Sequence, residues 1–197
     1  MCFFQRALRE ATPYLLQIMM QLPKQKISLG VGLPRDILRQ ASDFWEFEYV
    51  EIWRKTQRKD GEGCILTLDE DAMAMHPKAT AQCVTRFREA SREYTFERGQ
   101  GIPGRVWDDQ KIELQTNVQA LPESVFLRRK HAGPAGMAGA IGKPLIHNGE
   151  VAGVLVAFLN VGLDTPRGMN MVLNDIPKLD VVTCNLEAAM QRQCSVY

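Results

Sequence analysis

Apolar side chains recur at helical spacing near both ends of the chain. Thr12-Pro13 can begin a helix, because proline at the first helical position forfeits no hydrogen bond and threonine can cap it. A second short helix is predicted from Pro34, and a last one from Asn174 or Asp175, with Pro177 in its first turn. The three apolar stripes are Leu15, Ile18, Met19 and Leu22; then Ile37, Leu38 and Ala41; then Leu179, Val182, Leu186 and Ala189.

Between about residues 44 and 159 the pattern changes to that of β-strands with helical insertions. Trp45 to Tyr49 alternates aromatic with acidic side chains, and Val50 and Ile52 continue the alternation after a change of phase. Asp60-Gly61 is a turn signal, and a return strand is predicted from Cys64 to Leu68.

The clearest hairpin lies later in the chain. Residues 140–146 lead into Asn148-Gly149, a pair that accepts positive φ and favours a tight turn. The returning run, Val151 to Leu159, is apolar without a break, as expected of a central strand covered on both faces. The chain is thus divided into an N-terminal helical extension (1–42), a sheet domain (43–162), and a C-terminal linker and helix (163–197).

The most informative stretch runs from Phe96 to Trp107. Gly99 to Gly104 spells G-x-G-x-x-G, but a dinucleotide site needs a buried parallel strand before this motif and a crossover helix after it. The preceding residues 91–96 are too polar for such a strand, and Asp108-Asp109 closes any helix early. The nucleotide interpretation fails on context.

The same stretch resembles the GAF domain family. Family members carry an aromatic residue, a G-x-G-hydrophobic-Pro-Gly turn and a short helix that ends in a hydrophobic-Trp pair, here Val106-Trp107. Further marks follow in order: Phe126 to Arg128 on a mid-chain helix, small residues at 135–140, Gly142 to Leu145, and the 149–155 hairpin strand. The resemblance covers about residues 44–159. It implies an α+β fold, with a GAF/PAS-like antiparallel sheet of five to six strands flanked by helices and the N- and C-terminal helices packed together on one face.

Glycines around Pro103 let the backbone leave the sheet sharply and bring Trp107 back over it. Gly101 or Gly104 is therefore expected to have positive φ or to approach another group too closely for a Cβ.

Composition excludes several classes of function. A net charge of +1 argues against a nucleic-acid binder that depends on neutralising phosphates. The five cysteines are odd in number and lack C-x-x-C spacing, which excludes a disulfide framework or a zinc site of that type. No apolar run approaches the ~20 residues of a transmembrane helix. We expect an intracellular protein, soluble or peripheral, in the cytoplasm or, if a transit peptide has been removed, in an organelle.

The resemblance implies ligands, but the marks of each liganded type are absent. There is no signature for haem, bilin, cyclic nucleotide or metal, and the reductases of the family place a cysteine where Ile102-Pro103 stands here. His76, His131 and His147 are scattered, and the acidic cluster at 69–71 is interpreted as a solvated loop. The cofactor is therefore unknown, and the protein is not expected to be an enzyme.

Two functional hypotheses follow. One is a non-catalytic sensor or regulatory signalling domain that binds a small ligand or a protein partner. The other is a degenerate domain that serves as an accessory or scaffold subunit of a larger assembly without a ligand. In either case a protein partner is expected, together with a parallel homodimer through the terminal helices. For the sensor, the pocket is predicted between the sheet and residues 107–131, lined by Trp107, Leu114, Gln115, Asn117, Phe126 and His131.

Overall fold

The computed structural model describes residues 33–42, 45–76 and 81–194 and contains one six-stranded antiparallel sheet. Its strand order is β3-β2-β1-β6-β5-β4, and each neighbouring pair is antiparallel. The strands are β1 (Tyr49–Gln57), β2 (Cys64–Met75), β3 (Thr95–Phe96), β4 (Glu113–Gln115), β5 (Gly139–His147) and β6 (Glu150–Leu159). The helices are α2 (Pro34–Ala41), α3 (Ala81–Ser91), α4 (Gly101–Asp109), the 3₁₀ turn η1 (Val118–Ala120), α5 (Arg129–Ala132) and α6 (Pro166–Cys194). This confirms the predicted fold class.

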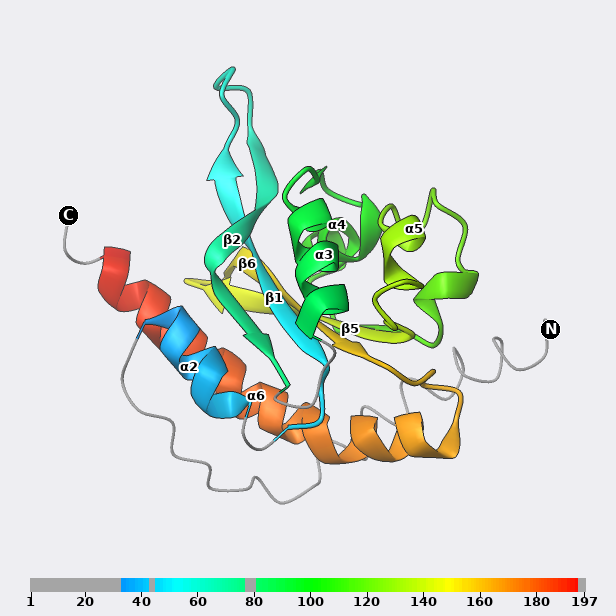
Figure 1. Ribbon diagram of the computed structural model, residues 1–197. Helices are drawn as coiled ribbons and strands as arrows, with labels where there is room; N and C mark the ends of the chain where they lie inside the picture. The colour runs from blue at the N-terminus through cyan, green and yellow to red at the C-terminus, as the bar shows by residue number, and fades with distance from the viewer. Residues whose placement is uncertain (1–32, 43–44, 77–80, 195–197) are drawn as a thin grey trace.

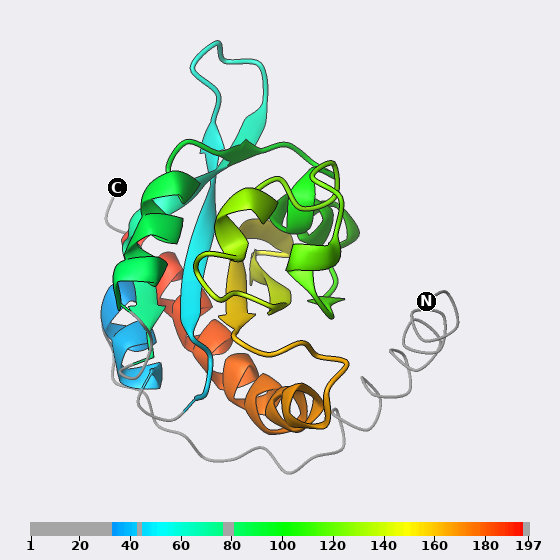
Figure 2. The ribbon, with the colours of Figure 1, turned by 45° about the vertical axis from the view of Figure 1, so that its right-hand side comes forward.

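Helices cover the sheet on both faces. Helices α2 and α6 pack together on one face, here called the outer face, and α3, α4 and α5 lie on the other, the inner face (Figures 1 and 2). The predicted helix after Thr12-Pro13 lies outside the described residues. The division of the chain at residues 42 and 162 stays a prediction.

The outer layer agrees with the sequence pattern except at one boundary. In α2 the predicted residues Ile37, Leu38 and Ala41 are buried, as is the whole predicted stripe of α6. The predicted start of α6 was wrong, because the helix begins at Pro166 and Pro177 lies inside it. Thr165 explains the earlier start, since its Oγ1 accepts a hydrogen bond from the N–H of Gly168 at 3.0 Å.

The first predicted strand also begins later than expected. Trp45 and Phe47 are buried on the outer face, but residues 45–48 are not in a strand, and β1 starts at Tyr49. The N–H of Glu46 donates to Asp175 Oδ2 on α6 at 3.0 Å, and the segment reaches the sheet only at Glu48, whose N–H donates to the carbonyl oxygen of Phe158 on β6 at 2.9 Å.

The β1–β2 hairpin projects beyond the two helical layers (Figure 1). β2 is longer than predicted and includes Asp69 to Asp71, so the interpretation of this acidic cluster as a loop was wrong. The cluster lies where the register between β1 and β2 shifts, between Glu51 and Trp53, and such an irregularity leaves room for charged side chains at an edge.

The predicted hairpin at Asn148-Gly149 is confirmed. Both residues have positive φ, 50° and 79°, and they join β5 to β6. β6 lies between β1 and β5, and its side chains alternate between the two cores, so the apolar run is indeed a central strand.

The glycine-rich turn behaves as predicted. Gly101 has φ +60°, and a Cβ there would lie 2.6 Å from Phe96 Cε1. A Cβ on Gly104 would lie 2.0 Å from the carbonyl oxygen of Glu97. This close approach turns the chain into α4, where Trp107 is 4% exposed. The predicted mid-chain helix starts slightly late, at Arg129, so Phe126 to Arg128 precede it.

Candidate functional site

The inner face carries a charged pair inside an aromatic core. Along β1 the side chains of Tyr49, Glu51 and Trp53 alternate with those of Val50 and Ile52, which belong to the outer core. Tyr49 and Trp53 are fully buried in the inner core, and Glu51, placed between them, has an exposed fraction of 0%. An acid in this position requires a cation inside the protein, because isolated buried carboxylates are strongly disfavoured.

Arg128 is that cation. It is the residue before α5, and its side chain is 1% exposed. Its Nη2 lies 2.6 Å from Glu51 Oε1, and its Nη1 donates to Ser91 Oγ at 2.7 Å. Glu51 Oε1 also accepts the indole N–H of Trp53 at 2.8 Å, and Ser91 Oγ donates to the carbonyl oxygen of Phe87 at 2.8 Å. The pair therefore joins β1, α3 and the segment before α5.

Aromatic rings surround this guanidinium. Its Cζ lies within the range of cation–π attraction of five ring centroids. The distances are 4.9 Å to Phe87, 5.0 Å to Trp53, 5.4 Å to Phe158, 5.7 Å to Phe126 and 5.8 Å to Phe96. We call Arg128, Glu51, Ser91 and these five aromatic residues the Arg128 cluster.

The polar atoms of the Arg128 cluster are not all satisfied. Glu51 Oε2, Arg128 Nε and Arg128 Nη2 make no hydrogen bond in the described structure, so Nη2 meets Glu51 Oε1 as an ion pair only. The Tyr49 hydroxyl approaches Glu51 without a well-formed hydrogen bond. Burial raises the pKa of Tyr49 well above its ordinary value, and the negative charge of Glu51 raises it further. Buried groups of this kind are concentrated at functional sites, so the cluster is a candidate site.

Three of the six predicted lining residues lie in or against the inner core. Phe126 is part of the Arg128 cluster. Trp107 belongs to the same core, with the guanidinium carbon of Arg98 5.0 Å from its ring centroid. His131 is half-buried on α5, edge-on to Tyr94 with ring centroids 6.3 Å apart.

The other three predicted residues are not part of the inner core, although Gln115 lies on the inner side of β4. Leu114 packs against the outer core, on the opposite face of the sheet. Gln115 Nε2 donates to Glu113 Oε1 at 2.5 Å. Asn117 caps η1 by accepting the N–H of Gln119 at 3.0 Å. The structure therefore does not bring the six residues into one pocket.

Sequence reasoning missed the charged members of the Arg128 cluster. Arg128 was interpreted as part of a mid-chain helix, and Ser91 as part of a polar segment. One signal was available: Glu51 stands between Tyr49 and Trp53 in a strand that is otherwise apolar at this point. An acid flanked by buried aromatic residues at period two indicates a buried partner cation.

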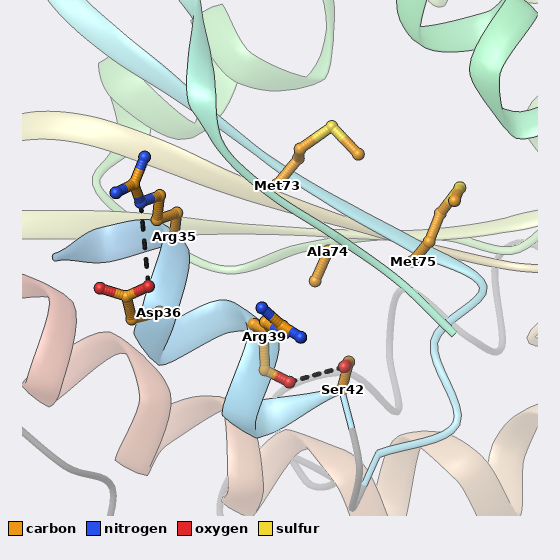
Figure 3. A pocket seen from close by; sticks show the side chains of 7 residues that line it. All are labelled: Arg35, Asp36, Arg39, Ser42, Met73, Ala74 and Met75. Atoms are coloured by element: carbon orange, nitrogen blue, oxygen red, sulfur yellow. Dashed lines mark hydrogen bonds and ion pairs between the residues drawn. The ribbon is translucent and has the colours of Figure 1, made fainter. Parts of the chain in front are cut away.

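An open recess lies between α2 and β2 (Figure 3). Its volume is about 520 Å³. In Figure 3 Ala74 points toward the helix, whereas Met73 and Met75 extend from the other side of the strand. A second recess of about 370 Å³ shares Arg35 with the first and includes Leu33, which is 45% exposed. We call the two recesses together the α2–β2 groove. The first is lined by Arg35, Asp36, Arg39, Ser42, Met73, Ala74 and Met75.

Within residues 33–42, 45–76 and 81–194, no group of three or more His, Cys, Asp or Glu side chains could hold a metal ion. Among the helices described there, none is long and apolar enough to cross a membrane.

The chain resembles part of two plant proteins, and no protein-family model matches it. Protein NLP9 of Arabidopsis thaliana is 30% identical over 129 residues, 60% of this chain and 14% of that protein. Protein NLP8 of the same plant is 29% identical over 131 residues, 60% of this chain and 13% of that protein. The chain thus spans about one-seventh of these relatives.

Solved structures identify the fold. The GAF domain of A. aeolicus nlh2 in an inactive state has a TM-score of 0.53 at 16% identity, covering 96% of this chain and 99% of that one. A GAF domain region of a putative membrane protein from Geobacter sulfurreducens PCA has a TM-score of 0.52 at 15% identity, covering 94% and 98%. Free methionine-R-sulfoxide reductase from Neisseria meningitidis has a TM-score of 0.50 at 17% identity, covering 94% and 91%. With its six-stranded antiparallel sheet between two helical layers, the chain has a GAF-like fold.

Proposed function

We propose that this chain is a non-catalytic regulatory domain that acts inside the cell by binding a protein partner. One observation carries the proposal: the chain's own side chains occupy the inner face, where a small ligand was expected. Arg128 and Glu51 are 1% and 0% exposed and lie among five aromatic rings. A ligand entering this space has to displace a buried ion pair, which favours a role as accessory subunit over a role as ligand sensor.

The α2–β2 groove is the surface that we propose for the partner. Arg39 makes no ion pair with the described residues, and Arg35 only approaches Asp36, at 3.8 Å. Leu33, which is 45% exposed, and Ala74, which points toward α2, add apolar surface to the groove. The complementary partner is a peptide segment with acidic side chains next to apolar ones.

A peptide-display experiment tests this proposal. A random 12-residue library is selected against the wild-type chain and then measured against the double charge reversal Arg35→Glu/Arg39→Glu. The matched control is Arg86→Glu/Lys130→Glu, which reverses two exposed charges on the inner-face helices. We expect enriched peptides that combine acidic and apolar residues and bind at least about tenfold more weakly to the groove variant. Peptides that bind all three proteins equally, or no enrichment, would contradict the proposal.

A small-ligand sensor is the second candidate function. It is favoured by Glu51 Oε2 and Arg128 Nε, which are buried without hydrogen bonds and could meet a ligand atom. Native mass spectrometry of the purified chain separates the two candidates. A retained small molecule that is lost in Arg128→Met supports the sensor, and an apo mass supports the partner-binding domain.

We also propose a homodimer through the terminal helices. One side of α6 carries half-buried or exposed apolar side chains at helical spacing, of which Val181 also packs against the outer core, and such a stripe is typical of a helix that packs on a second copy. Light scattering at micromolar concentration is expected to give twice the 22.2 kDa chain mass, and Cys184→Glu, at an exposed position, to shift it to the monomer. A monomer at all concentrations contradicts the dimer. The stripe consists of Leu173, Pro177, Val181, Cys184 and Ala188.

The absence of catalysis belongs to the same proposal. One protein of similar fold is a reductase, and reductases of the family place a cysteine at the position of Ile102-Pro103. Here both residues are buried in α4. Incubation with methionine-R-sulfoxide and a thiol reductant is expected to give no reduction above the protein-free rate. Turnover that depends on Cys64, Cys83 or Cys184 would overturn the proposal.

A further inference from the structure

The surroundings of Arg128 contain the groups with which proteins recognise a guanidinium ion. A carboxylate oxygen, Glu51 Oε1, lies 2.6 Å from one terminal nitrogen, and Ser91 Oγ accepts a hydrogen bond from the other at 2.7 Å. Five ring centroids lie 4.9–5.8 Å from the central carbon. A planar, delocalised cation is suited to both kinds of contact, because its edge donates hydrogen bonds while its face lies against π systems.

The Arg128 side chain is attached to the rest of the protein through a short segment outside the sheet. Arg128 immediately precedes α5, which has four residues and packs against η1 and α3. The ion pair with Glu51 connects this segment to β1, and the bond to Ser91 connects it to the end of α3. The Arg128 side chain therefore occupies the site like a bound ligand, but it is covalently attached to the chain through the segment from η1 to α5.

We propose that the inner face of the sheet contains a guanidinium-binding site, and that the Arg128 side chain is its intramolecular occupant. The site consists of the Arg128 cluster without Arg128 itself. It takes a small planar guanidinium cation in preference to an ammonium ion of the same charge or a neutral molecule of the same shape. In the intact chain this covalent attachment keeps the site filled, and the segment from η1 to α5 is thereby held against the sheet.

An ordinary core ion pair differs from such a site in what can replace it. A pair that serves only to neutralise Glu51 accepts any cation of suitable size, and it loses nothing specific when lysine replaces arginine. A recognition site discriminates by shape, because an ammonium ion cannot meet a carboxylate and a hydroxyl from one plane while its face lies against several rings. Chemical rescue of a variant that lacks the side chain distinguishes these two cases.

The experiment uses Arg128→Ala in the full chain, titrated with methylguanidinium chloride at constant ionic strength. Melting temperature and Trp fluorescence are recorded, since the Trp53 ring lies 5.0 Å from the guanidinium carbon. The additives for comparison are methylammonium, which keeps the charge, and methylurea, which keeps the shape. The matched control variant is Arg129→Ala, the next residue, whose side chain is exposed.

We expect saturable stabilisation of Arg128→Ala by methylguanidinium, with a half-saturation concentration on the order of millimolar. Methylammonium and methylurea should act at least about tenfold more weakly. Neither the wild type nor Arg129→Ala should respond. In Arg128→Ala/Glu51→Gln the response to methylguanidinium should be lost, because the counter-ion of the site is gone.

Two results overturn the proposal: equal responses to all three additives, or no response in a variant that remains folded. If Arg128→Ala does not stay folded alone, the same titration measures the recovery of folded protein on dilution from urea, and the same discrimination between additives is required. The result is independent of partner binding at the α2–β2 groove, which the rescue does not involve. Either proposal can therefore fail without the other.

Discussion

The two faces of the sheet are built from the same strands, yet they hold their helical layers by different means. On the outer face the core is apolar, and the buried carboxylate of Asp175 accepts the N–H of Glu46 and pairs with Lys178 at 2.5 Å. On the inner face an ion pair lies in the middle of the aromatic core. β1 serves both faces, with Val50 and Ile52 on one side and the acid on the other.

This difference shows what specifies each layer. Apolar burial is non-directional and scales with area, so α2 and α6 are held by the amount and fit of the buried surface. The Arg128 cluster depends on distances and angles between named atoms, and its partners lie far apart in the chain. The outer face should therefore tolerate apolar substitutions that conserve volume. The inner face should not tolerate a single substitution that removes a charge or a hydrogen bond from the Arg128 cluster.

The largest expected effect comes from removing one partner of the buried pair. Glu51→Leu leaves the guanidinium of Arg128 buried and uncompensated, which should lower the free energy of unfolding by about 3–5 kcal/mol in urea denaturation. The double variant Glu51→Leu/Arg128→Met should recover much of that loss, because no charge is then left inside. If the two single losses add in the double variant, the pair does not act as a unit.

Replacing a closely packed glycine by alanine should lower the free energy of unfolding by about the same amount on the two faces. A Cβ on Gly104 meets the Glu97 carbonyl oxygen at 2.0 Å on the inner side, and one on Gly168 meets the Gly162 carbonyl oxygen at 2.1 Å at the start of α6. Each change to alanine should cost about 3 kcal/mol, measured by chemical denaturation. Gly136→Ala is the control, since it has φ +70° but open space around it, and should cost about 1–2 kcal/mol. A smaller cost at Gly104 than at Gly136 would contradict the close approach.

Conservative substitutions should show the clearest difference in stability between the two faces. Leu186→Met keeps the volume of a buried residue on the outer face and should cost less than about 1.5 kcal/mol. Arg128→Lys keeps the charge but loses the hydrogen bond to Ser91 and the stacked plane, and should cost about 2 kcal/mol. If thermal unfolding shows the same loss of stability for Leu186→Met and Arg128→Lys, the two faces do not differ in how they hold their helices.

Alkaline pH should weaken the inner face through Tyr49. Its pKa is raised in the folded chain, so the hydroxyl keeps its proton there while an unfolded tyrosine ionises near pH 10. The unfolded state then binds fewer protons, so stability is fully present below about pH 10 and falls above it, by up to ~1.4 kcal/mol per pH unit. Tyr49→Phe should flatten this fall in urea denaturation between pH 9 and 11. An unchanged slope would assign the effect to other groups.

The smallest effect on stability is expected at the α2–β2 groove. Arg39→Glu alters an exposed side chain without a described ion pair and should change the free energy of unfolding by less than about 0.5 kcal/mol. Its predicted consequence is for peptide binding alone. A large loss of stability would mean that the groove belongs to the packing of the outer face.

Local chemistry explains which parts of the fold could be predicted. The turn at Asn148-Gly149 and the close approach of Gly104 depend on backbone properties of the residues themselves, and both were correctly predicted. The start of α6 was missed because Pro177 is typical of a first turn, and only the cap from Thr165 shows that the helix begins earlier.

The candidate site could be predicted only in part, because its contacts are non-local. Phe126 was predicted to line a pocket between the sheet and residues 107–131, and it does lie beside the buried cation. Arg128 was not, because nothing near it in the chain distinguishes it from its exposed neighbour Arg129. Its partners Glu51 and Ser91 are brought to it by the sheet and by the end of α3.

The position of Glu51 on β1 also has a consequence for folding. β1 pairs with β2 on one side and β6 on the other, and a slip of one residue would exchange its two faces. Tyr, Trp, Val and Ile can be buried on either face, so apolar patterning alone discriminates weakly between the native and the slipped sheet. A slip would place the carboxylate of Glu51 among the aliphatic side chains of α6 and leave Arg128 facing Ile52. The buried charge therefore specifies the register of β1. It stabilises the native alignment and makes the slipped alignment highly unfavourable. The energy gap between the native state and its closest competitor is larger as a result.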